Sequence, residues 1–198
     1  MKLYTLPHAG SIVAQVALTW AKAEHEVVKL DFAGTKTPEY LSLNPQGVVP
    51  LLDDNGFLIT QNMAILNYLN QIYPEAKLFG GGDIKAQTQV QQWFAFTNSD
   101  IHSKISVLFK AAQWVETDAA QASLKANVKA QLHQLYALWD QHLQAQAQKA
   151  LTIADVYVAV TMNWAKMHAL DLSDLVALNA LYERVMSDPA VQTVLAAQ

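Results

Sequence analysis

The sequence contains no cysteine among its 198 residues. The protein can therefore form no disulfide, hold no metal through thiolates and use no cysteine nucleophile of its own. Any thiol chemistry must use the thiol of a bound ligand. Histidines are few as well, and none of the six has a second histidine four residues away, so we expect no metal site.

Basic residues are outnumbered, with 13 Lys and Arg against 17 Asp and Glu, which gives a formal net charge of −4. No positive surplus is available to neutralise phosphates, so we expect no nucleic-acid partner. No apolar run is long enough to cross a membrane, and no signal-peptide core follows Met1. We therefore expect a cytoplasmic protein with no membrane partner.

What the chain has in quantity is apolar residues, which make up 52% of the sequence. Its length suits two modest domains, each able to bury a core. In the first part, short β-branched runs alternate with helical patterns and a D-D-N-G turn, which predicts the order βαβαββα with a parallel first pair. The predicted strands are 2–6, 26–32, 48–52 and 57–60, and the predicted helices are 11–23, 38–43 and 61–73.

Three glycines at 80–82 mark a linker, and the pattern after them is helical throughout. The predicted helices are 84–113, 118–148, 152–169 and 173–187, followed by a short one that starts at Asp188-Pro189. We therefore predict a first domain over 1–77, a linker over 78–83 and an all-α domain over 84–198.

Five segments, in this order and spacing, resemble the cytosolic glutathione transferases, with the bacterial beta class most similar. They are MKLYTLPHAGS (1–11), NPQGVVPLL (44–52), LITQNMAILNYL (58–69), WFAFTNSDIHS (93–103) and LTIADVYVAVTMNW (151–164). The resemblance implies a thioredoxin-like α/β N-terminal domain that binds glutathione, followed by an all-α domain. It also implies a detoxification enzyme that is a homodimer and takes glutathione as substrate, without a metal.

Val49 and Pro50 stand at the mouth of the predicted hairpin. The resemblance implies a cis bond between them, which would let the backbone of Val49 pair with the cysteinyl part of glutathione. The alternative is an ordinary trans proline that opens an edge strand.

Two further positions are expected to hold the ends of glutathione. Gln61 and Asn62 open a predicted helix, whose N-terminus suits the γ-glutamyl carboxylate. The family usually has Ser where this chain has Asn62, and the alternative for Asn62 is a plain N-cap. Lys36, in the loop after the second strand, matches a lysine that the family often places near the glycine carboxylate, although a lone loop lysine is more often only solvated.

The beta class typically has a cysteine at the start of the first helix, and the matching residue here is Gly10. Ser11, beside that helix N-terminus, is our main candidate for the sulfur partner, and a plain N-cap is its alternative. His102, in the segment that resembles the second-domain part of the site, is an auxiliary candidate, or else a surface or core histidine. Tyr4 suits packing better than catalysis.

The same segment contains Ser99 and Asp100, and the resemblance would place Asp100 or a neighbour near the ligand amine of a partner subunit. Some aromatic residues, such as Phe109, Trp114 and Trp164, are candidates for a pocket that takes an apolar second substrate. The capping box Thr152 to Asp155 is interpreted as a folding element only.

The function predicted first is transfer of the glutathione thiolate to small apolar electrophiles. A glutathione-dependent isomerase or dehalogenase is a second possibility. The third is a non-catalytic glutathione-binding or regulatory protein, because the family cysteine is missing.

Overall fold

The computed structural model describes residues 1–145 and 150–198. In this part the chain forms two compact units, one made of Met1–Gln87 with Ser187–Gln198 and one made of Thr88–Met186. The predicted domains, 1–77 and 84–198, are continuous in sequence and stay a prediction. In the structure, the C-terminal segment Ser187–Gln198 packs as part of the N-terminal unit.

A four-stranded sheet organises the N-terminal unit, in the order β2-β1-β3-β4. The pair β1–β2 is parallel, and the other two pairs are antiparallel, with Leu3 opposite Val27 and Leu52 opposite Ile59. The predicted parallel pair and hairpin are confirmed, although the second strand ends at Lys29 rather than at Phe32. The strands are β1 (Lys2–Thr5), β2 (Glu26–Lys29), β3 (Leu51–Asp54) and β4 (Phe57–Thr60).

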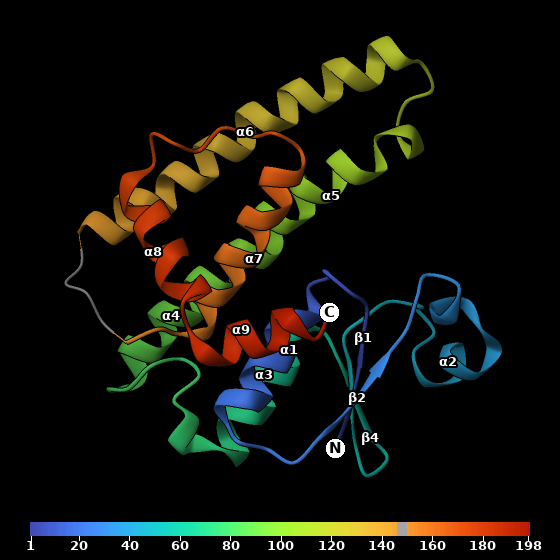
Figure 1. Cartoon of the computed structure of the whole chain (residues 1–198), viewed down its shortest axis with the longest axis vertical. Coiled ribbons are helices and arrows are strands. Elements are labelled where there is room, and N and C mark those ends of the chain that lie inside the picture. Colours follow the sequence, from blue (N-terminus) through green and yellow to red (C-terminus); the bar gives the residue numbers. More distant parts are fainter. Residues whose placement is uncertain (146–149) are drawn as a thin grey trace. The chain divides into compact units, whose positions relative to one another are not determined.

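Helices cover both faces of this sheet, with α1 and α3 on one face and α2 on the other (Figure 1). Helix α1 is buried from Ser11 to Leu18 because β1, α3 and α9 contact it from different sides. The Trp20 indole donates a hydrogen bond of 3.1 Å to Asp188, which also caps α9. The helices of this unit are α1 (Ser11–Trp20), α2 (Pro38–Leu43), α3 (Asn62–Ile72) and α9 (Pro189–Ala196), with short 3₁₀ turns at Gly34–Lys36 and Pro74–Ala76.

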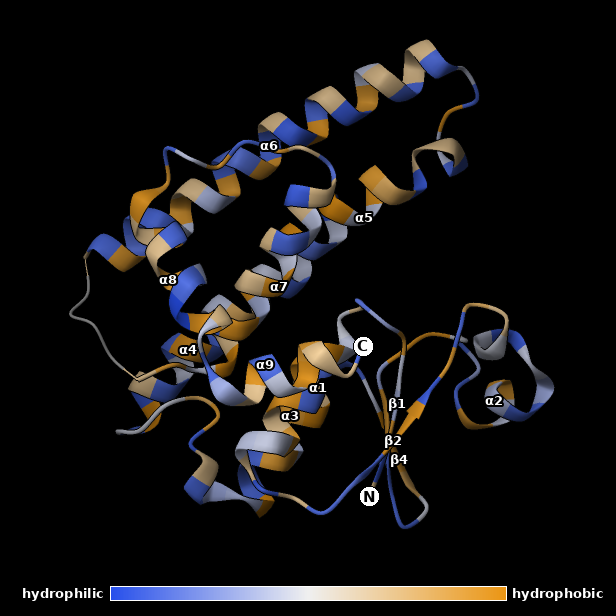
Figure 2. Cartoon of the chain, in the orientation of Figure 1, coloured by the Kyte–Doolittle hydropathy of each residue, from blue (hydrophilic) through white to orange (hydrophobic). Residues whose placement is uncertain are grey.

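The second unit is helical, as predicted, and is centred on α7, which is buried along most of its length. The longest helix, α6, carries hydrophilic residues along its whole length and buries only a narrow stripe (Figure 2). Its helices are α4 (Ile84–Phe96, which begins in the first unit), α5 (Ser103–Lys110), α6 (Asp118–Gln144), α7 (Ile153–Met167) and α8 (Val176–Met186).

Two expectations for this unit need correction or limits. The helix predicted over 84–113 is helical throughout but is not a uniform α-helix, because a π-helical segment at Thr97–His102 lies between α4 and α5, and a 3₁₀ turn follows at Ala111–Gln113. The predicted end of the next helix near Gln148 lies outside the described residues, and α6 is described to Gln144.

Candidate functional site

The start of α1 is held by the side chain of Ser11. Its Oγ accepts a hydrogen bond from the Leu6 N–H and donates one to the Leu6 carbonyl, each at 3.3 Å, and the residue is fully buried. The N-cap position belongs to Gly10, which has no side chain to offer. In the described chain no hydrogen bond uses the N–H of Gly10 or Ser11, as expected of a helix N-terminus.

The segment before β3 presents a free stretch of backbone. The Val49–Pro50 bond is cis, so that prediction is confirmed. The Val48 carbonyl accepts hydrogen bonds from the Tyr40 hydroxyl at 2.6 Å and from the Asn44 amide at 2.7 Å. The N–H and C=O of Val49, by contrast, make no hydrogen bond to any described residue. A free donor and a free acceptor on one residue are what a strand-like partner needs.

Lys36 lies against the turn that precedes this segment. Its Nζ donates to the Gly47 carbonyl at 2.7 Å, while the side chain stays exposed. Gly47 has φ of +60°, and a Cβ there would lie 2.7 Å from Lys36 Nζ and 2.8 Å from the Thr35 carbonyl. One of the three ammonium donors therefore fixes the turn, and the role of Lys36 toward a carboxylate stays a prediction.

Asn62 connects the start of α3 to the start of α1. It is the first residue of α3 and is 6% exposed, and its Nδ2 donates to the Gly10 carbonyl at 3.0 Å. Its Oδ1 is buried without a partner among the described residues. The alternative of Asn62 as a plain N-cap is wrong, because Gln61 holds that position with a positive φ of 69°. Such backbone strain is concentrated at functional sites.

His102, the candidate in the second unit, ends the π-helical segment. Its Nδ1 lies 2.5 Å from the Tyr157 hydroxyl, and that hydroxyl donates to Asn98 Oδ1 at 2.8 Å. The Trp164 ring lies beside it, with centroids 4.8 Å apart. Burial, and to a smaller extent the charge of Lys110, lower the pKa of His102 to about 4, so the imidazole is neutral near pH 7.

The neighbours of His102 face solvent. Ser99 Oγ lies 2.6 Å from an Asp100 carboxylate oxygen and 2.8 Å from the Ala95 carbonyl, and both Ser99 and Asp100 are exposed. Their role toward a partner's ligand stays a prediction.

The three aromatic candidates differ in exposure. Phe109 and Trp114 are 49% and 69% exposed, whereas Trp164 is buried at 6%. Tyr4 packs its ring on Tyr40, with centroids 5.6 Å apart, as its place in a strand suggested.

Sequence reasoning missed Tyr157 and Asn98, which fix His102. The only signal lay in the spacing of the capping box, which is confirmed by hydrogen bonds from the N–H and hydroxyl of Thr152 to Asp155. The capping box fixes the residue at which α7 begins and therefore the position of Tyr157 on that helix. It does not predict that Tyr157 contacts His102.

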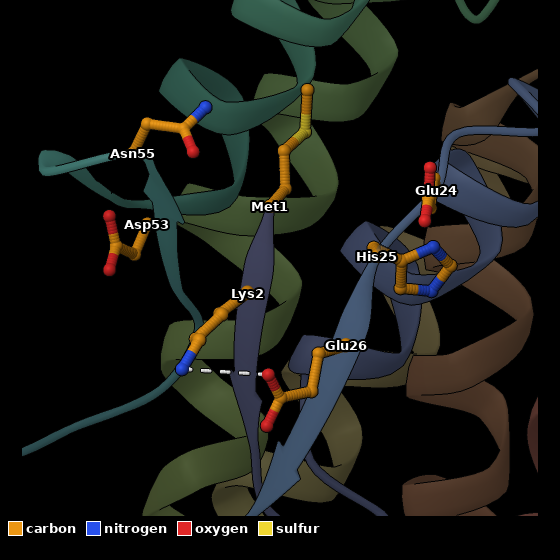
Figure 3. Close-up of a pocket in the computed structure, with 7 residues that line it drawn as sticks. All are labelled: Met1, Lys2, Glu24, His25, Glu26, Asp53 and Asn55. Atoms are coloured by element: carbon orange, nitrogen blue, oxygen red, sulfur yellow. Dashed lines mark ion pairs between the residues drawn. The ribbon is translucent and has the colours of Figure 1, made fainter.

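A separate hollow lies at the beginning of β1 (Figure 3). An exposed ion pair of 3.5 Å joins Lys2 and Glu26 there. None of the predicted site residues lines the hollow, and α1 begins beyond the other end of β1. The lining residues are Met1, Lys2, Glu24, His25, Glu26, Asp53 and Asn55.

The part of the chain that the structure describes was searched for metal-binding clusters and for membrane-spanning helices. It contains no group of three or more His, Cys, Asp or Glu placed to hold a metal ion. None of its helices combines the length and the apolar character that crossing a bilayer requires.

Comparison with known proteins gives one consistent result. Residues 1–71 match the family model of the glutathione S-transferase N-terminal domain. The glutathione S-transferase GST-4.5 of Xanthomonas campestris is 38% identical over 201 residues, which span 100% of this chain and 98% of that protein. The solved glutathione S-transferase of Xylella fastidiosa has a TM-score of 0.94 at 39% identity, covering 99% of this chain and 97% of its own.

Two other solved structures extend the comparison. A sphingomonad glutathione S-transferase complexed with glutathione has a TM-score of 0.84 at 30% identity. A bacterial beta-class glutathione S-transferase from Sphingomonas chungbukensis has a TM-score of 0.84 at 28% identity. Both matches cover 100% of this chain and 98% of the other. The bacterial relationship and the fold predicted from the five sequence segments are thereby confirmed.

Proposed function

The chain belongs to the glutathione S-transferase family, and we propose that it binds glutathione in its N-terminal unit and transfers the thiol to small apolar electrophiles. The observation that carries this proposal is the free backbone of Val49, whose N–H and C=O have no partner in the described chain. The cysteinyl residue of glutathione offers one N–H and one C=O, so the two backbones pair as neighbouring strands do.

The two charged ends of the peptide have complementary partners in the same unit. The γ-glutamyl carboxylate is assigned to the start of α3, where the first N–H groups after Gln61 lack helical partners and the helix dipole favours an anion. Lys36 is the cation that we assign to the glycine carboxylate, through the donors that Gly47 leaves free.

The sulfur is assigned to the start of α1, but through a different atom of Ser11 than the sequence suggested. The Ser11 hydroxyl is already used by Leu6, so the N–H groups of Gly10 and Ser11 are the available donors. Lowering a thiol pKa by two units from about 8.5 takes roughly 2.7 kcal/mol. Hydrogen bonds to a charged acceptor contribute about 1.5–3 kcal/mol each, and a helix N-terminus adds about 0.3–1 kcal/mol.

The experiment is a pH titration of the thiolate absorbance of bound glutathione, in the wild type and in Ser11→Ala. We expect the bound thiol to have a lowered pKa in both proteins, because the substitution keeps the N–H of residue 11. If the pKa of the bound thiol is lowered in the wild type but not in Ser11→Ala, the Ser11 hydroxyl is the group that stabilises the thiolate. A bound thiol with an ordinary pKa in the wild type would contradict thiol activation altogether.

Turnover assays distinguish a transferase from the two alternative functions, a glutathione-dependent isomerase or dehalogenase and a non-catalytic glutathione-binding protein. We expect conjugation of glutathione to an activated aromatic chloride, with S-methylglutathione as a competitive inhibitor that cannot react. Saturable binding of glutathione without turnover of such electrophiles would favour the non-catalytic binding protein, and turnover limited to isomerisation or dehalogenation would favour the other enzymes.

A homodimer and a cytoplasmic location belong to the same proposal. The support is the family relationship, in which an isologous contact would bring Asp100 toward the ligand amine of the other subunit. Sedimentation that shows only a 21.9 kDa monomer at micromolar concentration would contradict the dimer.

A further inference from the structure

One side chain joins the starts of helices α1 and α3 inside the N-terminal unit, where the two helices pack side by side (Figure 1). Asn62 is the first residue of α3 and is 6% exposed. Its Nδ2 donates to the Gly10 carbonyl at 3.0 Å. Gly10 is the N-cap of α1, so this bond holds the point at which that helix begins.

The rest of the Asn62 region is unfavourable for stability. Asn62 Oδ1 is buried without a partner among the described residues, and a buried acceptor without a partner opposes folding. Gln61, directly before it, has a φ of 69°, which is uncommon for a residue with a side chain. The chain thus keeps two unfavourable features while one amide N–H faces Gly10, which is typical of a functional position.

The peptide group between Gly10 and Ser11 carries this contact to the neighbouring N–H. Val49–Pro50 is the one cis bond in the described chain, so the Gly10–Ser11 bond is trans. In a trans peptide the C=O and the N–H lie in one rigid plane and point in opposite directions. A donor on the Gly10 carbonyl therefore fixes the direction of the Ser11 N–H, which has no hydrogen-bond partner in the described chain.

The same contact strengthens the Ser11 N–H as a donor. Hydrogen bonds polarise one another, so a peptide whose carbonyl accepts a bond donates more strongly through its N–H. Within α1 the Gly10 carbonyl also accepts from the Val13 N–H at 3.3 Å, and the bond from Asn62 is the shorter of these two.

We propose that Asn62 is a positioning residue, whose side chain holds the Gly10–Ser11 peptide so that the Ser11 N–H meets the sulfur of glutathione. Its backbone N–H serves the γ-glutamyl carboxylate, whereas its side chain acts on the sulfur through Gly10. The effect on the sulfur rests on the proposed function, but the hold on the peptide does not.

The first test uses Asn62→Ala and Asn62→Leu, which both remove the amide and keep the backbone N–H, while leucine also keeps most of the volume. The thiolate absorbance of bound glutathione is titrated in the wild type and in each variant. We expect the pKa of the bound thiol to rise by about half a unit or more in both variants, a part of what one hydrogen bond to a charged acceptor contributes. The Kd of S-methylglutathione, which has the γ-glutamyl end but no thiolate, should stay within about two-fold.

Asn67→Ala is the matched control. Asn67 lies on the same helix, and its Nδ2 also donates to a backbone carbonyl at 3.0 Å, that of Met63, without reaching α1. We expect it to leave the pKa of the bound thiol unchanged. Melting temperatures show that each variant is folded.

A second measurement needs no ligand. The backbone ¹⁵N resonance of Ser11 in the free protein reports on the peptide that Asn62 holds. We expect this resonance to shift in both Asn62 variants and to stay in place in Asn67→Ala.

The two measurements separate this proposal from the proposed function. An unchanged thiol pKa in both Asn62 variants would overturn the role toward the sulfur, and weaker binding of S-methylglutathione would then assign the side chain to the γ-glutamyl end. An ordinary thiol pKa in the wild type would refute thiol activation itself. In that case a shifted Ser11 resonance would still support the hold on the peptide, and an unshifted one would refute it.

Discussion

The buried imidazole of His102 makes the stability of the protein depend on pH. Its pKa is about 4 in the folded protein because burial, and then the charge of Lys110, disfavour the protonated form. In the unfolded chain the same group has a pKa of about 6.5. Between these values the unfolded state binds a proton that the folded state does not, so stability rises with pH. The contribution is complete above about pH 6.5 and is lost as the pH falls toward 4.

The size of this contribution follows from the difference of about 2.5 pH units. At 1.36 kcal/mol per unit, protonation removes about 3 kcal/mol of unfolding free energy, of which about 2 kcal/mol is already lost at pH 5. That is a large share of a typical stability of about 5–15 kcal/mol. The variant His102→Asn lacks the titrating group, while its amide can still donate to Tyr157.

The assay is urea unfolding of both proteins at several pH values between 5 and 7.5. All other groups titrate in both proteins and cancel in the comparison. We expect the wild type to lose about 2 kcal/mol more than His102→Asn over this range. Parallel stability curves would show that His102 titrates normally and would refute the low pKa.

Three other substitutions test the packing around the site. Gly47→Ala should lower the unfolding free energy by at least about 1 kcal/mol more than Gly56→Ala, measured by thermal melts. Both glycines have positive φ, but of the two only Gly47 has other atoms within reach of an added Cβ. Asn62→Ala should cost less than about 1 kcal/mol in urea unfolding, because the bond lost to Gly10 is offset by removal of the unpaired buried oxygen. Thr152→Ala should cost about 1–2 kcal/mol in the same assay through loss of the capping box.

Local patterns predict most of the fold because each element carries its own signal. The D-D-N-G turn identifies the hairpin, and Asp188-Pro189 identifies the start of α9. The π-helical segment has no such signal, since its residues are as compatible with an α-helix. A tertiary contact lies at its beginning, where the Trp139 indole donates to the Thr97 hydroxyl at 2.9 Å. The packing of α9 on α1 through Trp20 is equally non-local.

The site shows the same division between what sequence predicts and what it leaves open. The Val-Pro dipeptide before a hairpin is a local motif, and its geometry agrees with the prediction. The partners of Ser11 and His102 are not local. Sequence identifies a hydroxyl and an imidazole in suitable places, but their available atoms depend on Leu6 and Tyr157, which only the folded chain brings to them.

Two polar side chains, those of Ser11 and Asn62, fix the start of α1. Ser11 holds this helix start from the side of Leu6, and Asn62 holds it through the Gly10 carbonyl. The Ser11 hydroxyl and the Asn62 side-chain N–H group are thus used to fix the backbone at this helix start. A fixed helix start presents its N–H groups to an anion without reorganisation, which is the arrangement that stabilises developing charge most effectively. The proposed stabilisation of a ligand thiolate at this helix start therefore needs neither a cysteine nor a free hydroxyl.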